Sequence, residues 1–356
     1  MTAILDPSHP PQRIAVFRAL QLGDMLCAVP ALRALRQAFP RARILLAGLP
    51  GAREFVERFR SYLDELIIFP GIAAFPEQGA NEAGLPAFFR RLRAWQPDVA
   101  LQLHGSGSES NAVVRQFGAR QWVGFVPDTC AEMAGARMAW PDDLPEIQRY
   151  LALLRFAGLA NAHDTGLEFP CSVADESEAQ YLLRRYRLAP HKLVLIHVGA
   201  RLASRRWPLA RFAQIAQRLH QAGWHIALTG TAGERPMTTE LRQRAGIPLA
   251  DLSGMTNLGS LAALVRASRL LLCNDTGISH IAAAMKTPSI VVACGSDAAR
   301  WAPLDQHRHR VLFAPMPCRP CAYRSCPIGH PCALAITVPD VLHAAARQLA
   351  LYEGRA

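Results

Sequence analysis

Short apolar runs of four to six residues recur along the chain, and stretches with helical periodicity lie between them. Such runs are typical of buried strands in a parallel sheet, and the intervening stretches of amphipathic helices. In the first half, the predicted strands are residues 14–17, 44–47, 64–69, 98–103 and 121–126. The predicted helices there are residues 24–39 with Pro30 as an interruption, 52–59, 85–95, 110–117 and 144–157. Residues 70–84, which hold several glycines and prolines, are predicted to form a loop.

The second half repeats this alternation. Its predicted strands are residues 193–198, 224–228, 270–272 and 289–293, and its predicted helices are 209–221, 234–245, 258–267 and 338–351. Strands that alternate with helices twice over predict an α/β protein with two doubly wound domains. A polar, acidic connection at 164–178 separates the halves. We therefore expect one domain at 1–170, a second at 171–338, and a terminal helical segment at 339–356.

Polar turns follow several predicted strands, at residues 20–24, 104–108, 198–206, 229–234 and 274–280. In doubly wound sheets, ligands bind outside the carboxyl ends of the strands. Two facing domains that carry their polar turns at this edge predict a cleft with a ligand site.

The most polar of these turns combines Asp275, Thr276, Gly277, Ser279 and His280 between a strand and an alanine-rich helix. Glycine lets a ligand approach the backbone, and the first amides of a helix have no partner within it. This corner therefore favours phosphate binding. The alternative is that Asp275 or Thr276 only caps the helix.

A second turn, Arg18 to Asp24, contains Gly23 and precedes the Pro-Ala-Leu sequence at 30–32. Gly23 permits a tight turn, and Asp24 opens the predicted helix. A carboxylate that faces the cleft could accept a proton from an attacking hydroxyl. An N-cap role for Asp24 is the alternative.

Two further turns carry candidate ligand contacts. Arg205 and Arg206 precede a Trp-Pro pair, and adjacent guanidinium groups could neutralise a diphosphate or could form a solvated basic loop. Residues 229–234 are glycine-rich but match neither a Walker A sequence nor a complete dinucleotide fingerprint. Glu234 at its end could bind ribose hydroxyls or could favour a helix N-terminus.

Four thiols, Cys318, Cys321, Cys326 and Cys332, lie within fifteen residues. They could hold one zinc ion, with His330 as a substitute ligand. However, only one pair has the C-x2-C spacing, which favours free or reversibly paired thiols, and we expect no metal. The odd total of nine cysteines argues against a disulfide framework.

The formal charge of +11 and the pI near 9.7 favour an anionic partner: a nucleotide, a phosphorylated glycan, an anionic membrane surface or nucleic acid. Only 7% of residues are aromatic and they do not interleave with basic residues, which argues against nucleic acid. The polar N-terminus lacks the apolar core of a signal peptide, so we expect a cytoplasmic protein. No Asp-x-Asp pair is present, which favours neutralisation of a diphosphate by protein groups rather than by a divalent metal ion.

In combination and in this order, the sequences at 23–24 with 30–32, at 205–208 and at 275–280 resemble those of glycosyltransferase family 9, the heptosyltransferases of lipopolysaccharide core synthesis. The resemblance runs over nearly the whole chain. It implies a GT-B fold, in which two Rossmann-like domains face each other across the active site. It also implies that the terminal helix could pack back on the first domain.

By this resemblance, the second domain binds ADP-heptose and the first binds a phosphorylated lipid A–core acceptor at the anionic inner membrane surface. The implied roles are Asp24 as general base, Arg18 and Gly23 on the acceptor side, Glu234 on the ribose, Asp275 on sugar hydroxyls, and Arg205, Arg206, Thr276, Gly277, Ser279 and His280 on the diphosphate. The family usually has Lys where this chain has Arg205. No cofactor is implied.

The expected reaction is a single in-line displacement that inverts the anomeric centre. Two alternatives stay open from sequence alone. One is a family 9 transferase that uses another nucleotide sugar or glycan acceptor. The other is a basic nucleotide-binding or nucleic-acid-binding protein without catalysis.

Overall fold

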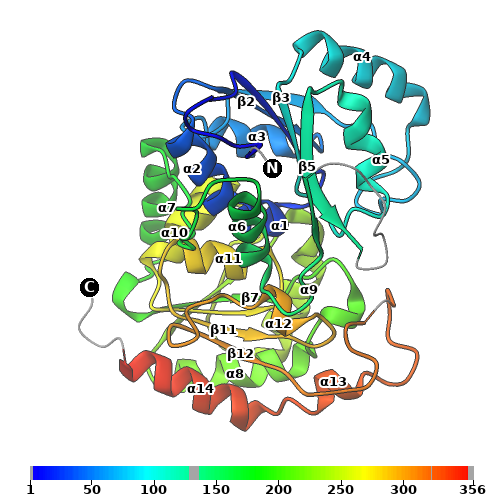
Figure 1. The fold of residues 1–356 in the computed structure, drawn as a ribbon. Helices are drawn as coiled ribbons and strands as arrows, with labels where there is room; N and C mark the ends of the chain where they lie inside the picture. Colours follow the sequence, from blue (N-terminus) through cyan, green and yellow to red (C-terminus); the bar gives the residue numbers. More distant parts are fainter. Residues whose placement is uncertain (1–2, 128–135, 322, 352–356) are drawn as a thin grey trace. The chain divides into compact units, whose positions relative to one another are not determined.

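The computed structural model describes residues 3–127, 136–321 and 323–351. The chain divides into two compact units, Met1–Leu167 and Glu168–Ala356. The division falls within the polar segment at 164–178. Each unit is an α/β structure built on one parallel sheet, and the fold class predicted from the alternation of strands and helices is confirmed (Figure 1).

The first unit is built on a six-stranded sheet in the order β3-β2-β1-β4-β5-β6, with every pair of neighbours parallel. Its strands are β1 (Arg13–Phe17), β2 (Arg43–Gly48), β3 (Glu65–Ile68), β4 (Val99–Gln102), β5 (Gln121–Val126) and β6 (Ala136–Ala139). Its helices are α1 (Leu22–Leu26), α2 (Val29–Ala38), α3 (Ala52–Arg58), α4 (Leu85–Trp95), α5 (Ser110–Val114) and α6 (Glu146–Phe156), with short 3-10 turns η1 (Glu82–Gly84) and η2 (Arg115–Phe117).

Two features of this unit differ from the sequence prediction. The single helix expected at 24–39 is divided into α1 and α2, because Pro30 lies in the first turn of a new helix that begins at Val29. The edge strand β6 was not predicted. Its described side chains are half-buried or exposed, so no apolar run marks this strand.

The second unit is built on a sheet in the order β12-β11-β10-β7-β8-β9, again with parallel neighbours throughout. Its strands are β7 (Leu193–His197), β8 (His225–Thr229), β9 (Ala250–Asp251), β10 (Leu270–Asn274), β11 (Ser289–Val292) and β12 (His309–Leu312). Its helices are α7 (Val173–Arg185), α8 (Leu209–Gln221), α9 (Arg235–Ala245), α10 (Leu258–Ala267), α11 (Gly277–Ala284), α12 (Ala298–Trp301), α13 (Pro331–Leu334) and α14 (Val338–Leu351), with 3-10 turns η3 (Pro190–Lys192), η4 (Ala203–Arg205) and η5 (Ala232–Glu234).

Helix α7 begins in the segment that was predicted to be an acidic connection. Ser172 and Asp175 form a reciprocal capping box at its start, so the polar residues that suggested a linker begin a helix instead. The edge strands β9 and β12 were also not predicted. Strand β9 has only two residues, and β12 has the sequence His-Arg-Val-Leu, in which only His309 is fully buried.

Both sheets share one topology. Within each unit, the first strand of the chain lies in the middle, and successive strands extend to one side before the chain crosses to the other. This is the doubly wound Rossmann order, in which the crevice between the two central strands receives the ligand. The two switch points lie between β1 and β4 and between β7 and β10.

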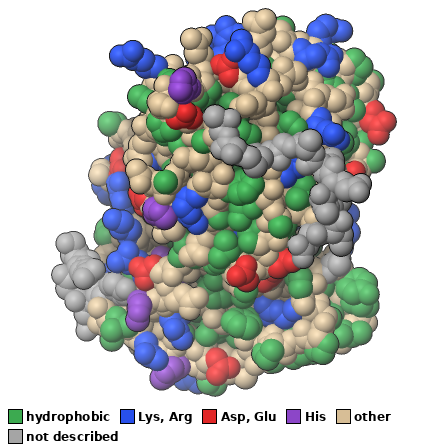
Figure 2. Space-filling model, viewed as in Figure 1, with side chains coloured by type: hydrophobic (Ala, Val, Ile, Leu, Met, Phe, Trp, Pro, Cys, Tyr) green, Lys and Arg blue, Asp and Glu red, His purple; other side chains and the backbone are tan. Residues whose placement is uncertain are grey.

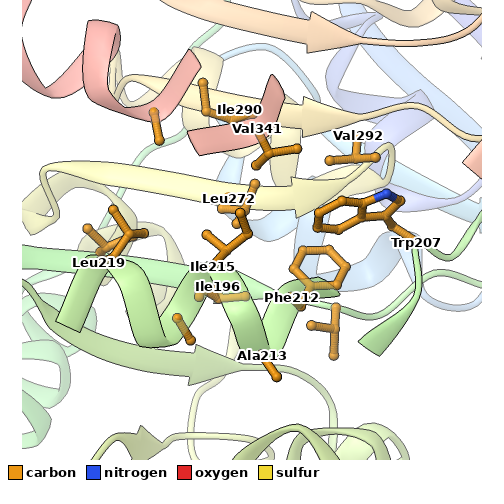
Figure 3. Close-up of a cluster of buried hydrophobic side chains, with 14 of the residues drawn as sticks. Ile196, Trp207, Phe212, Ala213, Ile215, Leu219, Leu272, Ile290, Val292 and Val341 are labelled. Atoms are coloured by element: carbon orange, nitrogen blue, oxygen red, sulfur yellow. The ribbon is translucent and has the colours of Figure 1, made fainter. Parts of the chain in front are cut away.

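The core of the second unit lies between its sheet and helices α8 and α14. Trp207 and Phe212 meet edge to face with ring centroids 5.0 Å apart, and strand residues such as Leu272 and Ile290 complete the cluster (Figure 3). The terminal helix α14 buries Val341 in this same core. Within the second unit, α14 also contacts α8, β10 and β11. The expectation that the terminal segment could pack back on the first domain stays a prediction; residues 352–356 lie outside the described part.

The described part of the chain contains helices of four to fourteen residues. None of the helices in this part is both long and apolar enough to cross a bilayer.

Candidate active site

The switch point of the first unit is formed by the turns that follow β1 and β4. The His104 ring at the end of β4 packs against Phe17 and Phe75, and its Nδ1 accepts a hydrogen bond from the Ala19 amide (3.2 Å). This bond assigns the ring proton to Nε2. Burial, and secondarily the charge of Arg18, lowers the pKa of His104 to about 3, so the ring is a neutral anchor for the turn.

Arg18 lies at the start of this turn and is fully buried. Its Nε and Nη2 donate to the carbonyl of Asp24, and its Nη1 donates to the carbonyl of Leu103 and to the Tyr150 hydroxyl. Burial opposes its charge, but Tyr150 and Glu146 outweigh burial and raise the pKa of Arg18. We expected Arg18 on the acceptor side; in the structure its guanidinium is occupied within the protein and fixes the turn instead.

Asp24 lies in the first turn of α1, with Gly23 before it. The N-cap position belongs to Gln21, and no side chain caps the helix there. Asp24 is therefore not an N-cap residue. Asp24 and Gly23 are both half-buried, and the bonds from Arg18 to the Asp24 carbonyl hold the backbone at this point. The geometry leaves a partly accessible carboxylate on a fixed backbone at the switch point.

In the second unit, Asn274 joins the two turns of the switch point. It is the last residue of β10 and is fully buried. Its Oδ1 accepts from the Trp207 amide (2.9 Å), and its Nδ2 donates to the Val198 carbonyl (2.7 Å). The turn after β7, which carries Arg205 and Arg206, is thereby held beside the turn that begins at Asp275.

The 275–280 turn begins helix α11, and Thr276 is its N-cap residue. The Thr276 side chain makes no capping bond, so the interpretation as a simple cap does not apply. Asp275, Thr276 and Gly277 are half-buried. In contrast, Ser279 is 0% exposed and donates to the Thr276 carbonyl (2.9 Å), and His280 is 4% exposed. These two side chains, expected to contact a diphosphate, lie within the unit, and the Ser279 amide also donates to the Thr276 carbonyl (2.9 Å). The groups of this turn that can reach a ligand belong to Asp275, Thr276 and Gly277.

The arginine pair differs in how its side chains are held. Arg206 Nε donates to the Ala200 carbonyl (2.9 Å). Arg205 Nε is buried and has no hydrogen-bond partner within the described part of the chain. Both residues are half-buried rather than fully solvated. A buried, unsatisfied donor on the turn that Asn274 joins to the start of α11 favours a ligand contact over a solvated loop.

Glu234 forms a capping box at the start of η5. Its Oε2 accepts from the amide and the hydroxyl of Thr231 (2.8 and 3.0 Å), as the alternative of a helix-starting role predicts. Its carboxylate also lies over Gly199, where a Cβ atom would be 1.8 Å from Glu234 Oε1. The carboxylate thus reaches from the turn after β8 to the turn after β7, and it lies at the switch-point edge.

The cysteine cluster does not form a metal centre in this structure. Among the described residues, which include Cys318, Cys321, Cys326 and Cys332, no three His, Cys, Asp or Glu side chains come close enough to hold an ion. The described cysteines form no disulfide with one another, and His330 donates its backbone amide to Cys326 Sγ (3.2 Å).

Sequence reasoning gave no role to Asn274 or to the buried group around Arg18. The signal for Asn274 was a polar residue at the end of an otherwise apolar strand. Glu146 and Tyr150 carried no comparable signal, because they lie on α6, about 130 residues from Arg18 along the chain.

Comparison with known proteins gives consistent results. Residues 85–331 match the family model for glycosyltransferase family 9 (heptosyltransferase). The chain is 28% identical over 185 residues to lipopolysaccharide heptosyltransferase 2 of Escherichia coli, which covers 49% of this chain and 51% of that protein. The matched segment thus spans about half the length of that relative.

Two solved structures are similar over most of the chain. A family 9 glycosyl transferase from Veillonella parvula superposes with a TM-score of 0.80 at 20% identity, covering 96% of this chain and 98% of that one. An E. coli heptosyltransferase solved with ADP has a TM-score of 0.70 at 18% identity, covering 94% and 99%. These likenesses show the GT-B fold. Because the family model spans more than half of the residues, the chain belongs to glycosyltransferase family 9.

Proposed function

We propose that this protein transfers a heptose from ADP-heptose to the phosphorylated inner core of lipopolysaccharide, with inversion at the anomeric carbon. The observation that carries the proposal is the position of the family-like sequences: 18–24, 198–206 and 275–280 all follow the central strands of the two sheets. The donor assignment is further supported by the similar E. coli heptosyltransferase solved with ADP.

The second unit supplies the donor site. The free amides at the start of α11 and the Thr276 hydroxyl bind the diphosphate, because the helix N-terminus offers unpaired donors and a positive dipole. Arg205 and Arg206 neutralise the diphosphate as it departs, without a divalent metal ion. Glu234 holds the ribose, and Asp275 holds sugar hydroxyls.

The first unit supplies the general base. The Asp24 carboxylate accepts the proton of the acceptor hydroxyl while that oxygen attacks the anomeric carbon. The bond between this carbon and the β-phosphate oxygen breaks, and ADP leaves with the bonding electrons. Arg18 acts as a positioning residue, because it holds the Asp24 backbone from a buried site.

Asp24→Asn tests the assignment of the base. General-base catalysis contributes about 10²–10⁴ to rate, so turnover at saturating substrates should fall by that factor while ADP binding in calorimetry is unchanged. Asp143→Asn is the matched control, because Asp143 is an exposed carboxylate of the same unit. Lost ADP binding with normal turnover at saturation would show that Asp24 is not the base.

The choice of donor needs a separate experiment. A thermal-shift screen of nucleotide sugars should give the largest stabilisation with ADP-heptose, and a smaller one with ADP, because binding to the folded state raises the unfolding temperature. A preference for UDP- or GDP-sugars would instead support a family 9 transferase with another donor. Transfer to a phosphorylated lipid A–core acceptor presented on anionic vesicles would test the acceptor and the peripheral membrane contact together.

A non-catalytic, nucleic-acid-binding role is the remaining candidate. It would require salt-sensitive RNA binding without transfer of the sugar. The basic side chains on the face drawn in Figure 2 are spread over that face rather than gathered into one stripe, which offers no support for it.

A further inference from the structure

A cavity of about 610 Å³ lies at the amino-terminal edge of the second sheet. Its wall includes residues immediately before β7, β10, β11 and β12, namely 190–191, 268–269, 287–288 and 308. The proposed donor groups follow the opposite ends of these strands. Since a five-residue strand is about 16 Å long, this cavity is separate from the donor site. A volume of this size suits a small-molecule ligand.

Positive charge dominates the wall of this cavity. Its charged lining residues are Arg266, Arg269, Lys286 and Arg308, and no acidic residue of the described chain lines it. Two neighbouring carboxylates offset part of this charge: Glu176 pairs with Arg266, and Asp305 lies 3.7 Å from Arg308. The four cations of the wall outnumber these two carboxylates, and Arg269 Nη2 also donates to the Leu349 carbonyl (3.1 Å).

Helices α10 and α11 both end at this cavity, so the cations could merely complement the negative ends of the helix dipoles. Two of the terminal carbonyls already have other partners, however. Thr287 donates its hydroxyl to the Val265 carbonyl (2.8 Å) and its amide to the Ala282 carbonyl (2.9 Å). The ammonium group of Lys286 makes no hydrogen bond or ion pair within the described part of the chain. Capping of the helix ends therefore does not account for Lys286.

Lys286 also has a backbone conformation that favours glycine, with φ of +57° just after α11. Lys192 and Lys286 are the only lysines in a sequence that otherwise uses arginine for positive charge. An ammonium is a compact, rotatable donor that binds phosphate as a point charge. The sequence thus keeps an unpaired ammonium at the cavity in a position where glycine would be less strained.

We propose that this cavity is a second anion site, which binds a phosphate group through Lys286 with Arg269 and Arg308 beside it. The phosphate could belong to a lipid headgroup or to a soluble phosphorylated molecule, and both offer the same oxygens to the same cations. The site is distinct from the donor site of the proposed function, and its existence does not depend on catalysis.

The two lysines allow a direct test on the full-length protein. Amine acylation followed by peptide mass spectrometry reads Lys286 and Lys192 separately, so Lys192 serves as an internal control. Inorganic pyrophosphate should slow acylation of Lys286 about threefold or more and leave Lys192 unchanged, because a bound anion occludes the ammonium. Sodium chloride at equal ionic strength should not reproduce this effect, since screening acts on both lysines alike.

Variants and vesicles complete the experiment. Arg308→Gln should abolish most of the protection, while Arg242→Gln, an exposed arginine on α9, should preserve it. Vesicles of phosphatidylcholine with phosphatidylglycerol, compared with phosphatidylcholine alone, replace pyrophosphate in a parallel series. Protection by the anionic vesicles alone would assign the site to a lipid headgroup, and protection by pyrophosphate to a soluble phosphate. Equal acylation of Lys286 under all conditions, or protection unaffected by Arg308→Gln, would overturn the proposal.

Discussion

The contact between Gly199 and Glu234 gives a prediction that separates the structural role of Glu234 from its proposed role in donor binding. An alanine Cβ at position 199 would lie 1.8 Å from Glu234 Oε1 and 2.9 Å from Oε2, so the carboxylate must move by more than an ångström. The backbone at Gly199 does not have positive φ, so alanine itself is tolerated there. The movement breaks the two bonds that Thr231 donates to Oε2.

The expected cost follows from those two bonds. Loss of a capping interaction costs about 1 kcal/mol, so Gly199→Ala should lower the free energy of unfolding by about that amount. Glu234→Ala should cost about the same, because it removes the same box. In the double variant the three atoms nearest to the alanine Cβ at 199, all of them Glu234 carboxylate atoms, are gone. The total should therefore stay near 1 kcal/mol rather than reach about 2 kcal/mol.

Urea denaturation of the four proteins measures this coupling. ADP titration of the same four proteins tests the proposed role of Glu234 in donor binding. If Glu234 holds the ribose, both single variants and the double variant should bind ADP more weakly, and to a similar degree. Additive losses of stability would refute the steric argument. Unchanged ADP affinity in Glu234→Ala would refute the ribose contact while leaving the capping box intact.

Two predictions concern the buried polar groups. Arg18→Met should lower the free energy of unfolding by about 3 kcal/mol in urea denaturation. The variant leaves the Glu146 carboxylate, which is 1% exposed, with only part of its partners. A loss well below 1 kcal/mol would show that Arg18 does not balance this buried charge. His104 and His309, whose pKa values burial lowers from 6.5 to about 3 and about 4, remain neutral in the folded chain while the unfolded chain takes up protons. The contribution of these residues to the free energy of unfolding is therefore full above pH 6.5. It should fall by up to about 1.4 kcal/mol per pH unit for each histidine as the pH drops toward 4. His309→Gln should make this pH dependence of the free energy of unfolding shallower.

The central strands could be predicted because they are fully buried and therefore apolar without interruption. Their polar turns could be predicted because each turn directly follows such a strand. Strand order then follows from the handedness of the crossovers, and the order places the turns at 18–24 and 275–280 on switch points. The edge strands β6 and β12 were missed because only one side of an edge strand is paired and their sequences do not form an apolar run.

Side-chain directions at the turns could not be predicted. Ser279 and His280 follow Thr276 on the same short helix, but the helical turn directs them into the unit while Thr276 stays half-exposed. The burial of Arg18 depends on Tyr150 and Glu146, which approach only when α6 packs. Local sequence identifies the turns that contain candidate functional residues. Which of these residues reach a ligand depends on packing partners that are distant along the chain.

The buried Nε of Arg205 has a consequence for both stability and binding. Arg205 Nε is buried without a partner in the described structure, and such a donor costs about 1–3 kcal/mol. A lysine at this position has no Nε–H to bury, while a diphosphate oxygen would satisfy the arginine. Arg205→Lys should therefore raise the free energy of unfolding of the ligand-free protein and weaken ADP binding, measured by urea denaturation with and without ADP. Arg206→Lys is the matched control, since Arg206 Nε already donates to Ala200 and its loss should not stabilise the ligand-free chain. If Arg205→Lys left the stability of the ligand-free protein and its ADP affinity unchanged, Arg205 Nε would not be part of the site that binds the nucleotide sugar.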